Sequence, residues 1–282
     1  MLDRQAIVGK TFAPLTQTVS REAAWAYALA TNDTNPRYES GGIAPPMFAV
    51  VLEMPALLTA LRDPDVIVDP KRFLRLLHGE HDMVFHGKLV PGRVYGTSVK
   101  ITRVAEKAGN EIIELSVVTT DTQRGDVVVE TSSSMFIRGE TKDAAPAEAR
   151  APRPERVRTL VLDVEEQVAA DQSLRYADAS GDHNPIHKDP EVAKKAGLPD
   201  IILHGLCSMA FCQKAVVNQL AAGEPERLKR LKVRFAKPVL NGQILRIHGW
   251  EADAAPWSRS VAFDARVDGQ VVLKDGLAEL ST

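Results

Sequence analysis

The stretch YADASGDHNPIHKDP, residues 176–190, brings together side chains that can hold or move protons. Within six positions it contains Asp182, Asn184 and His187, with Pro185 among them. Proline fixes its own backbone dihedral and cannot continue a helix, so the three side chains are expected to converge in a loop. A carboxylate and an imidazole beside a hydrogen-bonding amide suit acid–base chemistry. The pattern favours a catalytic loop over its plainer alternative, an Asx turn that caps a helix.

An earlier stretch repeats this one without its last histidine. YALATNDTNPRY at 27–38 is identical to 176–187 at six of twelve positions, at an offset of 149 residues. MVFHGKLVPGRVY at 83–95 and VRFAKPVLNGQIL at 233–245 agree at an offset of 150. Two matches at nearly one offset indicate a tandem duplication.

The segment between the two copies, GETKDAAPAEARAPRPE, is rich in proline, alanine and charge. Such a composition cannot bury a core, so the segment is interpreted as a linker. The sequence therefore predicts a first unit over 1–140, a linker over 141–155 and a second unit over 156–282.

Each unit is expected to run from a helix through the motif to an apolar helix and then to strands. In the second unit the first helix covers 165–181 and stops at Gly181, and the apolar helix covers 204–220. In the first unit the apolar helix covers 46–61. Alternation and turn residues predict the strands 94–104, 110–120, 126–137, 230–239, 243–253, 259–267 and 270–280. This order predicts an α+β fold in which a buried helix is wrapped by a curled antiparallel sheet, twice, with the two sheets joined edge to edge.

The composition excludes several classes of protein. The 282 residues carry a formal net charge of −2 and are 44% hydrophobic, without a long run of one sign that would favour nucleic acid or an anionic membrane. No apolar run approaches the roughly 20 residues that span a bilayer. The start, MLDRQAIVGKTF, lacks the apolar core of a signal peptide. We therefore expect a cytoplasmic protein with no membrane span, in which Cys207 and Cys212 are buried thiols.

Tyr176 and the run SGDHNPIH at 180–187 resemble the signature of the MaoC-like (R)-specific enoyl-CoA hydratases, also called hydratase 2. ILHGL at 202–206 is similar to another segment of that family, and His78-Gly79-Glu80 resembles a segment of its double-domain eukaryotic members. The resemblance covers essentially the whole chain and implies a double hotdog fold. It also implies a CoA-thioester substrate from fatty acid metabolism and no metal or redox cofactor.

Hydration of a 2-enoyl thioester needs a base for water, an acid for C2 and donors for the enolate oxygen. Asp182 and His187 can supply the first two, and in the family they hold one water between them. Asn184 can orient that water or the partner side chain. Gly205 stands where the apolar helix begins, so its N–H and the helix dipole suit an oxyanion. A side chain at 205 is expected to obstruct the thioester.

Further residues are candidates for substrate binding. Tyr176 and His204 adjoin the motif, and a structural place at the helix start is the favoured alternative for His204. The basic pair Arg234 and Lys237 is a candidate for the CoA phosphates, although charges on a strand face are usually solvated. The apolar pair Met47 and Val50 is predicted to line an acyl pocket, with simple filling of the core as the alternative.

The first unit departs from the family pattern at its catalytic positions. Tyr38 replaces the histidine, Asn32 replaces the glycine, and Pro45-Pro46 replaces the histidine-glycine pair. Proline has no N–H for an oxyanion, so a single active site is predicted, in the second unit. In double-hotdog members the degenerate unit makes room for the acyl chain, and the resemblance implies the same here.

Metal sites are the first alternative chemistry. His183 and His187 have the four-residue spacing of metal ligands on a helix, but Pro185 separates them, and no metal is predicted. Another cluster contains three histidines, for which loop and interface roles are favoured: His78, His81 and His86.

Four other functions compete with the hydratase. The first is a 3-hydroxyacyl dehydratase that acts on acyl carrier protein, and the second is a mesaconyl-type hydratase with Arg37 as the partner of a second carboxylate. The third is a thioesterase, a class that places a carboxylate on the buried helix, as Glu53 does in the first unit. The last is a silent acyl-thioester-binding protein. The expected partner is acyl-CoA or acyl-ACP, and the fused pseudo-dimer is expected to work as a monomer or a homodimer.

Overall fold

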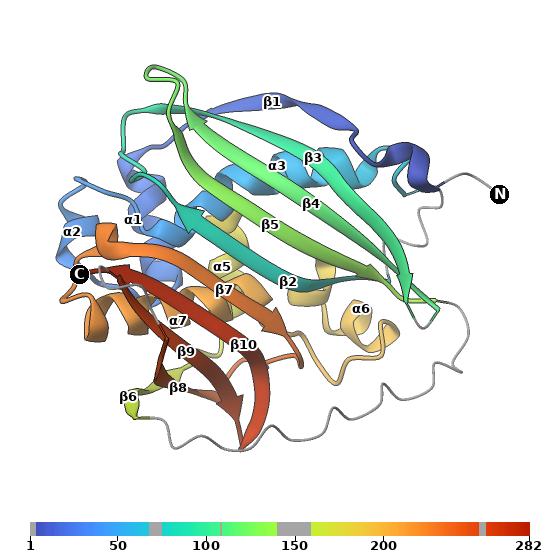
Figure 1. Ribbon diagram of the computed structural model, residues 1–282. Coiled ribbons are helices and arrows are strands. Elements are labelled where there is room, and N and C mark those ends of the chain that lie inside the picture. The colour runs from blue at the N-terminus through green and yellow to red at the C-terminus, as the bar shows by residue number, and fades with distance from the viewer. Residues whose placement is uncertain (1–3, 68–74, 108, 140–158, 254–257) are drawn as a thin grey trace.

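A computed structural model describes residues 4–67, 75–107, 109–139, 159–253 and 258–282. One antiparallel sheet of ten strands runs through these residues, in the order β1-β3-β4-β5-β2-β7-β10-β9-β8-β6 (Figure 1). The first five strands of the chain occupy one half of the sheet and the last five the other half. The predicted linker 141–155 lies outside the described residues, and the boundaries of the two units stay a prediction.

The strands of the first half are β1 (Thr11–Thr18), β2 (Leu76–Phe85), β3 (Val94–Lys107), β4 (Asn110–Asp121) and β5 (Val127–Ile137). Those of the second half are β6 (Leu160–Gln167), β7 (Leu228–Phe235), β8 (Ile244–Ala252), β9 (Ser258–Val267) and β10 (Gln270–Ser281). The α-helices are α1 (Arg21–Ala30), α2 (Pro36–Glu39), α3 (Ala49–Arg62), α5 (Gln172–Ser180), α6 (Pro190–Lys195) and α7 (Gly205–Leu220). Short 3₁₀ turns are η1 (Arg4–Ile7), η2 (Pro46–Phe48), η3 (Pro185–His187) and η4 (Pro225–Arg227).

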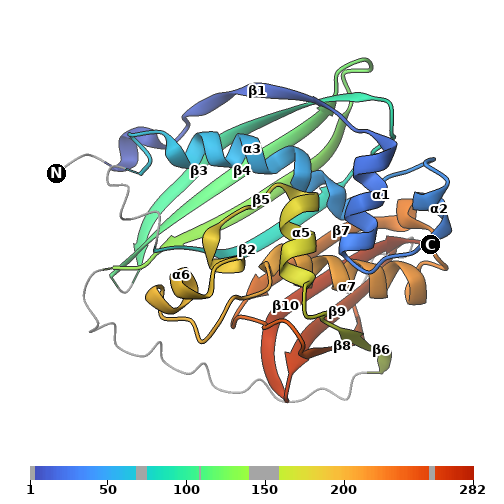
Figure 2. The ribbon, with the colours of Figure 1, turned by 180° about the vertical axis from the view of Figure 1, so that it is seen from behind.

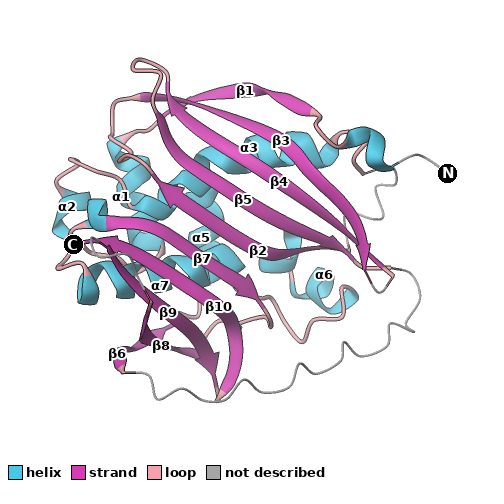
Figure 3. Cartoon of the chain, viewed as in Figure 1, coloured by secondary structure: helices cyan, strands magenta, loops and turns pink. Residues whose placement is uncertain are grey.

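Two long apolar helices lie on the same side of the sheet, one for each half (Figure 2). α3 packs against β1, β3 and β4, and α7 packs against β6, β7 and β10. The strands form one layer and the helices gather behind it (Figure 3). As predicted, α7 is buried on nearly all sides and contains both free cysteines, Cys207 and Cys212. The predicted fold, a helix wrapped by a curled antiparallel sheet twice over, is confirmed.

The two halves join where β2 pairs with β7, and we call this pairing the seam. Its register sets Glu80 opposite Arg234 and Val84 opposite Arg230. On the outer face, Arg230 donates two hydrogen bonds to Asp82, at 2.9 and 2.7 Å. Such partly solvated ion pairs contribute at most about 1 kcal/mol each. The inner face is fully buried and includes Met83, Leu231 and Val233, so apolar burial carries most of the stability of the seam.

Three strands differ from the prediction. The helix expected over 165–181 is wrong in its first part, because Leu160–Gln167 form β6 and α5 begins only at Gln172. Glu165, Glu166 and Gln167 favour a helix, but pairing with β8 at the end of the sheet overrides that preference. The corresponding end strand β1 and the seam strand β2 are also absent from the prediction. The end of α5 agrees with the prediction, since Gly181 caps the helix with φ 75°.

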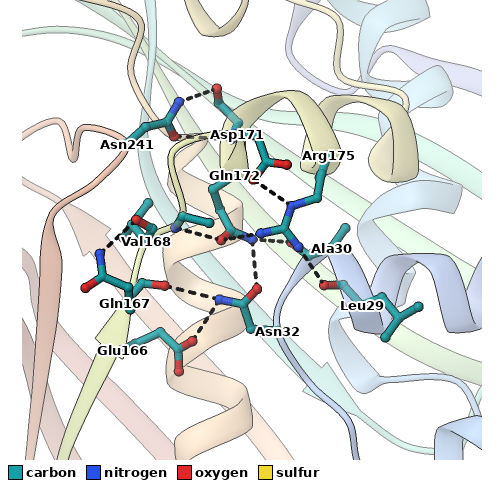
Figure 4. Close-up of polar contacts among 12 residues, drawn as sticks. Leu29, Ala30, Asn32, Glu166, Gln167, Val168, Asp171, Gln172, Arg175 and Asn241 are labelled. Atoms are coloured by element: carbon teal, nitrogen blue, oxygen red, sulfur yellow. Dashed lines mark hydrogen bonds and ion pairs between the residues drawn. The ribbon is translucent and has the colours of Figure 1, made fainter.

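Asn32 shows why the first unit tolerates a residue other than glycine at this turn. It adopts φ 53°, so the left-handed turn is kept, and asparagine enters that region more readily than most residues. Its amide donates to Glu166 Oε1 at 2.9 Å and to the Gln167 carbonyl at 3.3 Å (Figure 4). In return, Gln172 Nε2 donates to the Ala30 carbonyl at 2.7 Å. The degenerate loop therefore ties the first half of the chain to the second.

We predict that Asn32→Gly lowers the free energy of unfolding by about 1 kcal/mol, the net worth of a typical hydrogen bond. Asn32→Ala should cost about 1 kcal/mol more, because a side chain with a Cβ is strained in the left-handed region. Urea unfolding followed by circular dichroism measures both. Equal stability of the wild type and the glycine variant would contradict the role of the Asn32 amide.

Candidate active site

The catalytic loop predicted after α5 is held by its own polar side chains. Asp182 Oδ1 accepts a hydrogen bond from the Asn184 N–H at 3.2 Å, and Asn184 Oδ1 accepts one from the Ile186 N–H at 3.4 Å. The Asx turn considered as the plain alternative is therefore present. It does not use up either side chain, since the other Asp182 oxygen and the Asn184 NH₂ group are left for further contacts. Asp182 is half-buried, so solvent reaches it.

His187 is buried, and its Nδ1 lies 2.8 Å from the Ile202 carbonyl oxygen. A carbonyl only accepts, so this contact assigns the ring hydrogen to Nδ1 and leaves a lone pair on Nε2. Burial lowers the pKa of His187, and the nearby Asp182 carboxylate partly opposes that shift. Near neutral pH the ring is therefore uncharged, with Nε2 ready to accept a proton.

His204 stacks on His187, with ring centroids 3.7 Å apart and planes at 26°. Its Nε2 lies 2.9 Å from the Asp182 main-chain oxygen, so it donates there and fixes the start of the loop. Burial, and then the His187 ring, lower the pKa of His204 to about 2. A group that stays neutral and is tied to the backbone suits a structural role, which is the alternative favoured for this residue.

Asp182, His187 and His204 offer ligand atoms that all lie within 4.8 Å of one another. Such a cluster is a candidate for metal binding as well as for proton transfer. His187 Nδ1 and His204 Nε2 contact main-chain carbonyls, so each ring has one nitrogen left, as a metal ligand also would. The same arrangement suits a water molecule held between the Asp182 carboxylate and the His187 imidazole.

Gly205 is the first residue of α7, and its N–H has no acceptor among the described residues. The first N–H groups of a helix lack partners within the helix and carry its positive end. A Cβ at this position would lie 2.8 Å from the Phe235 ring. Any side chain at position 205 would therefore clash with Phe235 of β7. This clash explains the glycine in a way that the sequence did not indicate.

The other predicted binding residues fall into two groups. Tyr176 is buried with its ring centroid 4.9 Å from that of His204, so it lies behind the stacked histidines. Arg234 contacts Asp275 at 3.3 Å, and Lys237 contacts Gln270 at 2.6 Å. Arg234 lies on the central strand β7 and Lys237 in the segment that follows it, and both side chains are exposed, as solvated charges are.

Met47 and Val50 lie in the main hydrophobic core, with exposed fractions of 0% and 2%. That position matches the alternative in which they fill the core. The partly buried apolar residues of the same helix are Val51 and Met54. Met54 lies eight positions after Pro46, as Gln213 lies eight after Gly205.

The degenerate site of the first unit is closed by that Gln213. Its Nε2 donates to Asp33 Oδ2 at 3.3 Å, and its Oε1 accepts from the Met47 N–H at 2.9 Å. Tyr38, where the second unit has its histidine, is completely buried. Burial raises the pKa of Asp33 to about 6. Asp33 is buried and hydrogen-bonded, so this degenerate site leaves no space for a substrate beside its carboxylate.

A polar cluster whose arrangement local spacing did not predict lies beside the catalytic loop. Loop and interface roles were predicted for His78 and His81; they lie in a strand and not in a loop, within β2 at the seam between the two halves. His86 follows β2 and pairs with Glu130 at 2.8 Å. The buried Glu53 of α3 faces His81. A glycine inside a strand, here Gly79, was the signal that could have located the cluster, because it often marks a bulge.

Comparisons with known proteins agree with this arrangement. Residues 144–271 match the family described as MaoC like domain, and residues 6–131 match the FAS1-like dehydratase domain region. "Probable enoyl-CoA hydratase 2" of Dictyostelium discoideum is 30% identical over 210 residues, which cover 73% of this chain and 70% of that protein. "Enoyl-CoA hydratase 2, peroxisomal" of Arabidopsis thaliana is 30% identical over 217 residues, covering 73% and 68%.

A solved structure named "MaoC-like dehydratase" superposes over 99% of both chains with a TM-score of 0.83, at 20% sequence identity, and so has the same fold. The chain belongs to the MaoC-like dehydratase family, a family of hydro-lyases, and has the double hotdog fold. Among the described residues, every helix is too short or too polar to cross a bilayer.

We predict that Asp182→Asn lowers turnover by about 10²–10⁴-fold, the usual effect of losing a general acid or base. Asparagine keeps the Oδ1 acceptor for the Asn184 N–H, so the loop should hold its shape. The matched control is Asp33→Asn in the closed site, which should change turnover by less than about threefold, well below the range for a lost proton carrier. Steady-state kinetics with an enoyl thioester, on variants checked by circular dichroism, decides between them. Equal damage from both changes would contradict a single active site.

Proposed function

We propose that the protein catalyses the reversible hydration of 2-enoyl-CoA to (R)-3-hydroxyacyl-CoA. The observation that carries the proposal is the placement of an accessible Asp182 beside His187, whose Nε2 is free, at the loop that leads to the unpartnered N–H of Gly205. The relatives named enoyl-CoA hydratase 2 support the same reaction.

In the proposed reaction, one water is held between the Asp182 carboxylate and His187 Nε2. Its oxygen adds to C3 while the Asp182–His187 pair takes one of its protons. The electron pair of the double bond moves toward the thioester oxygen, where the Gly205 N–H and the positive end of α7 stabilise the developing charge. The pair then returns the proton to C2 on the same face. The substrate gains the elements of water, and the protein recovers its starting protonation state.

Asn184 is suited to orient the water. Its side-chain oxygen already accepts from the Ile186 N–H, so its NH₂ group is the part that is left for a donor role. His204 and Tyr176 support the loop from behind, through the stacking on His187 and the contact between their own rings. We do not assign the CoA phosphates to Arg234 or Lys237, because Arg234 pairs with Asp275 and Lys237 donates to Gln270.

Three rival substrates or reactions have less support. A dicarboxylic substrate would need Arg37, but Arg37 pairs with Glu226. A thioesterase would use Glu53, but this carboxylate is buried and accepts a hydrogen bond from Thr131 at 2.6 Å. An acyl-ACP substrate would need a docking surface for its carrier, so we keep CoA as the carrier.

Two further expectations stay predictions: that the fused pseudo-dimer works as a monomer or a homodimer, and that the protein is cytoplasmic. One relative is named as peroxisomal.

The test is the loss of enoyl-thioester absorbance when crotonyl-CoA is added. The product is then offered to (R)- and (S)-specific 3-hydroxyacyl-CoA dehydrogenases, and only the (R)-specific enzyme is expected to oxidise it. The assay is repeated after dialysis against a chelator, because the proposed chemistry needs no metal. An (S) product, or activity that chelation removes and zinc restores, would overturn the proposal.

The acyl chain is proposed to lie on the side of the first unit, along α3. Met54 takes the position on α3 that Gln213 takes on α7, and Gln213 reaches the aspartate of the closed site. Met54 should therefore lie near Asp182, and a thioether adapts to acyl groups of irregular shape. This assignment moves the pocket wall from the fully buried Met47 and Val50 to the partly buried Met54.

We predict that Met54→Trp lowers kcat/KM for long enoyl chains by at least about 10-fold relative to crotonyl-CoA, since a filled pocket discriminates by about 1–3 kcal/mol per misplaced methylene. Met47→Trp is the control. It should lower the thermal midpoint of unfolding because the core there is full, and leave the ratio between chain lengths unchanged. An unchanged ratio for a folded Met54→Trp variant would leave the first unit without a role in binding the chain.

A further inference from the structure

A row of polar groups runs from the interior of the first half to the wall of the catalytic site. Glu53 on α3 and His81 on β2 are both buried, with exposed fractions of 1% and 0%. His81 Nδ1 lies 3.2 Å from His78 Nε2, and the two rings meet edge to face. The His78 ring in turn lies 4.8 Å from the ring of Phe235, the residue that contacts Gly205.

A β-bulge makes this row possible. Residues three apart in a regular strand point to opposite faces of the sheet. The pairing of β2 with β5 shifts between His78 and Glu80, so Gly79 is the extra residue. A Cβ at Gly79 would lie 2.1 Å from the Phe136 ring, so only glycine fits. The bulge turns both histidines to the inner face, where Ser133 of β5 contacts His78 Nε2 at 2.9 Å.

Two atoms in this row lack hydrogen-bond partners. Glu53 Oε2 and His81 Nε2 are buried and have no hydrogen bond among the described residues, and they face each other at 3.9 Å. Leaving a buried polar atom unpaired costs about 1–3 kcal/mol. The gap is too long for a hydrogen bond and too short to hold a bridging water. Glu53 Oε2 and His81 Nε2 can therefore satisfy each other by a hydrogen bond, provided that one of them carries a hydrogen and the two side chains move closer.

We propose that Glu53, His81 and His78 form a directional hydrogen-bond chain that fixes the tautomer of His78 and thereby holds the Phe235–Gly205 wall of the catalytic site. In this chain the protonated Glu53 turns its Oε2 toward His81 Nε2, closes the 3.9 Å gap and donates to it, and His81 Nδ1–H donates to His78 Nε2, 3.2 Å away. His78 then carries its hydrogen on Nδ1, and the lone pair on its Nε2 is shared by His81 Nδ1–H and the Ser133 hydroxyl. His78 is a positioning residue, since it acts on the site through Phe235 and Gly205. Its effect on turnover rests on the proposed hydratase function, whereas the chain itself does not.

The protonation states that this direction requires agree with the surroundings of each group. Burial raises the pKa of Glu53 to about 7, partly opposed by the hydrogen bond from Thr131. Burial lowers the pKa of His81 well below its usual value, and His78 lowers it further. Burial also lowers the pKa of His78 to about 4, against the effect of the Asp182 carboxylate. Below neutral pH the carboxylic acid thus carries the proton, and both rings are neutral.

Other groups around Glu53 do not change this assignment. From β2 it faces His81, and from β5 it faces Thr131, which does not titrate. From α1 the Tyr27 hydroxyl is close enough to be affected, and burial together with Glu53 raises the pKa of that phenol far above the physiological range. Tyr27 therefore stays neutral. Loss of the Glu53 proton at higher pH would reverse the chain, because His81 would then donate from Nε2 to the carboxylate.

The tautomers are measured directly by ¹⁵N–¹H spectra of the histidine rings in the intact protein, with no substrate. At pH 6 we expect His81 and His78 to carry hydrogen on Nδ1, and at pH 8.5 we expect the His81 hydrogen to have moved to Nε2. In Glu53→Gln the amide donates at every pH, so His81 should keep its Nδ1–H at both. A wild-type His81 that has the same tautomer at both pH values would overturn the proposal. This measurement does not depend on a variant that folds.

Stability gives a second readout. The folded pKa of Glu53 is raised above its unfolded value, so its contribution is fully present below the unfolded pKa and is lost as pH rises through about 7. The thermal midpoint of the wild type should therefore fall relative to that of Glu53→Gln as pH rises from about 4.5 to about 7. A constant difference between the two midpoints would contradict a titrating Glu53.

Turnover gives the third readout. It distinguishes a chain that positions the catalytic site from one that only stabilises the fold. With crotonyl-CoA, Glu53→Gln should keep its turnover near pH 6.5 and lose less of it at pH 8.5 than the wild type. His81→Phe should lower turnover by about 10-fold at both values, equivalent to about 1.4 kcal/mol. If the spectra behave as expected but no variant alters turnover, the chain exists without the positioning role. If the wild type has no hydratase activity, the proposed function fails while the chain is still tested by the spectra.

Discussion

The whole arrangement depends on the pairing of β2 with β7. This seam turns two curled sheets into one and sets Glu80 opposite Arg234. Because the inner face of the seam is buried, its register is fixed: a slip by one residue would expose Met83 and Leu231 and bury charges in their place. The register also decides that Phe235 of the second half meets His78 of the first. The candidate active site is therefore a product of both halves, although its proton-carrying loop comes from one.

The two copies of the loop differ in their accessibility, although they occupy equivalent positions in the fold. Both keep the aspartate, the asparagine and the proline, and in both the asparagine caps a short helical turn. In the first copy Gln213 of the opposite half closes over Asp33, whereas Asp182 of the second copy stays accessible. In a dimer of identical chains every substitution appears in both sites. The fusion of the halves removes that constraint, so one loop can be given up while the other is kept.

The sequence predicted the features that depend on local chemistry. The duplication, the buried helices and the helix stop at Gly181 follow from composition and spacing, and the structure agrees with them. β6 escaped prediction because its residues favour a helix and only the partner strand β8 makes it extended. Spacing brought Asp182 and His187 together, but the groups behind them come from distant segments. Glu53, His81 and Phe235 lie on three different elements, and no local pattern joins them.

Among the described residues, the sheet is open at both ends, where β1 and β6 each have one edge without a partner strand. Such edges invite other chains to add strands, and proteins resist this with proline, charge and irregular pairing. β1 contains Pro14, and its pairing with β3 shifts between Phe12 and Leu15. β6 carries Asp163 and Glu165, and its pairing with β8 shifts near Leu160. A protein whose edge strands are both protected against pairing with other chains should stay monodisperse at high concentration. A substitution at Pro14 is therefore expected to increase aggregation while leaving catalysis unchanged.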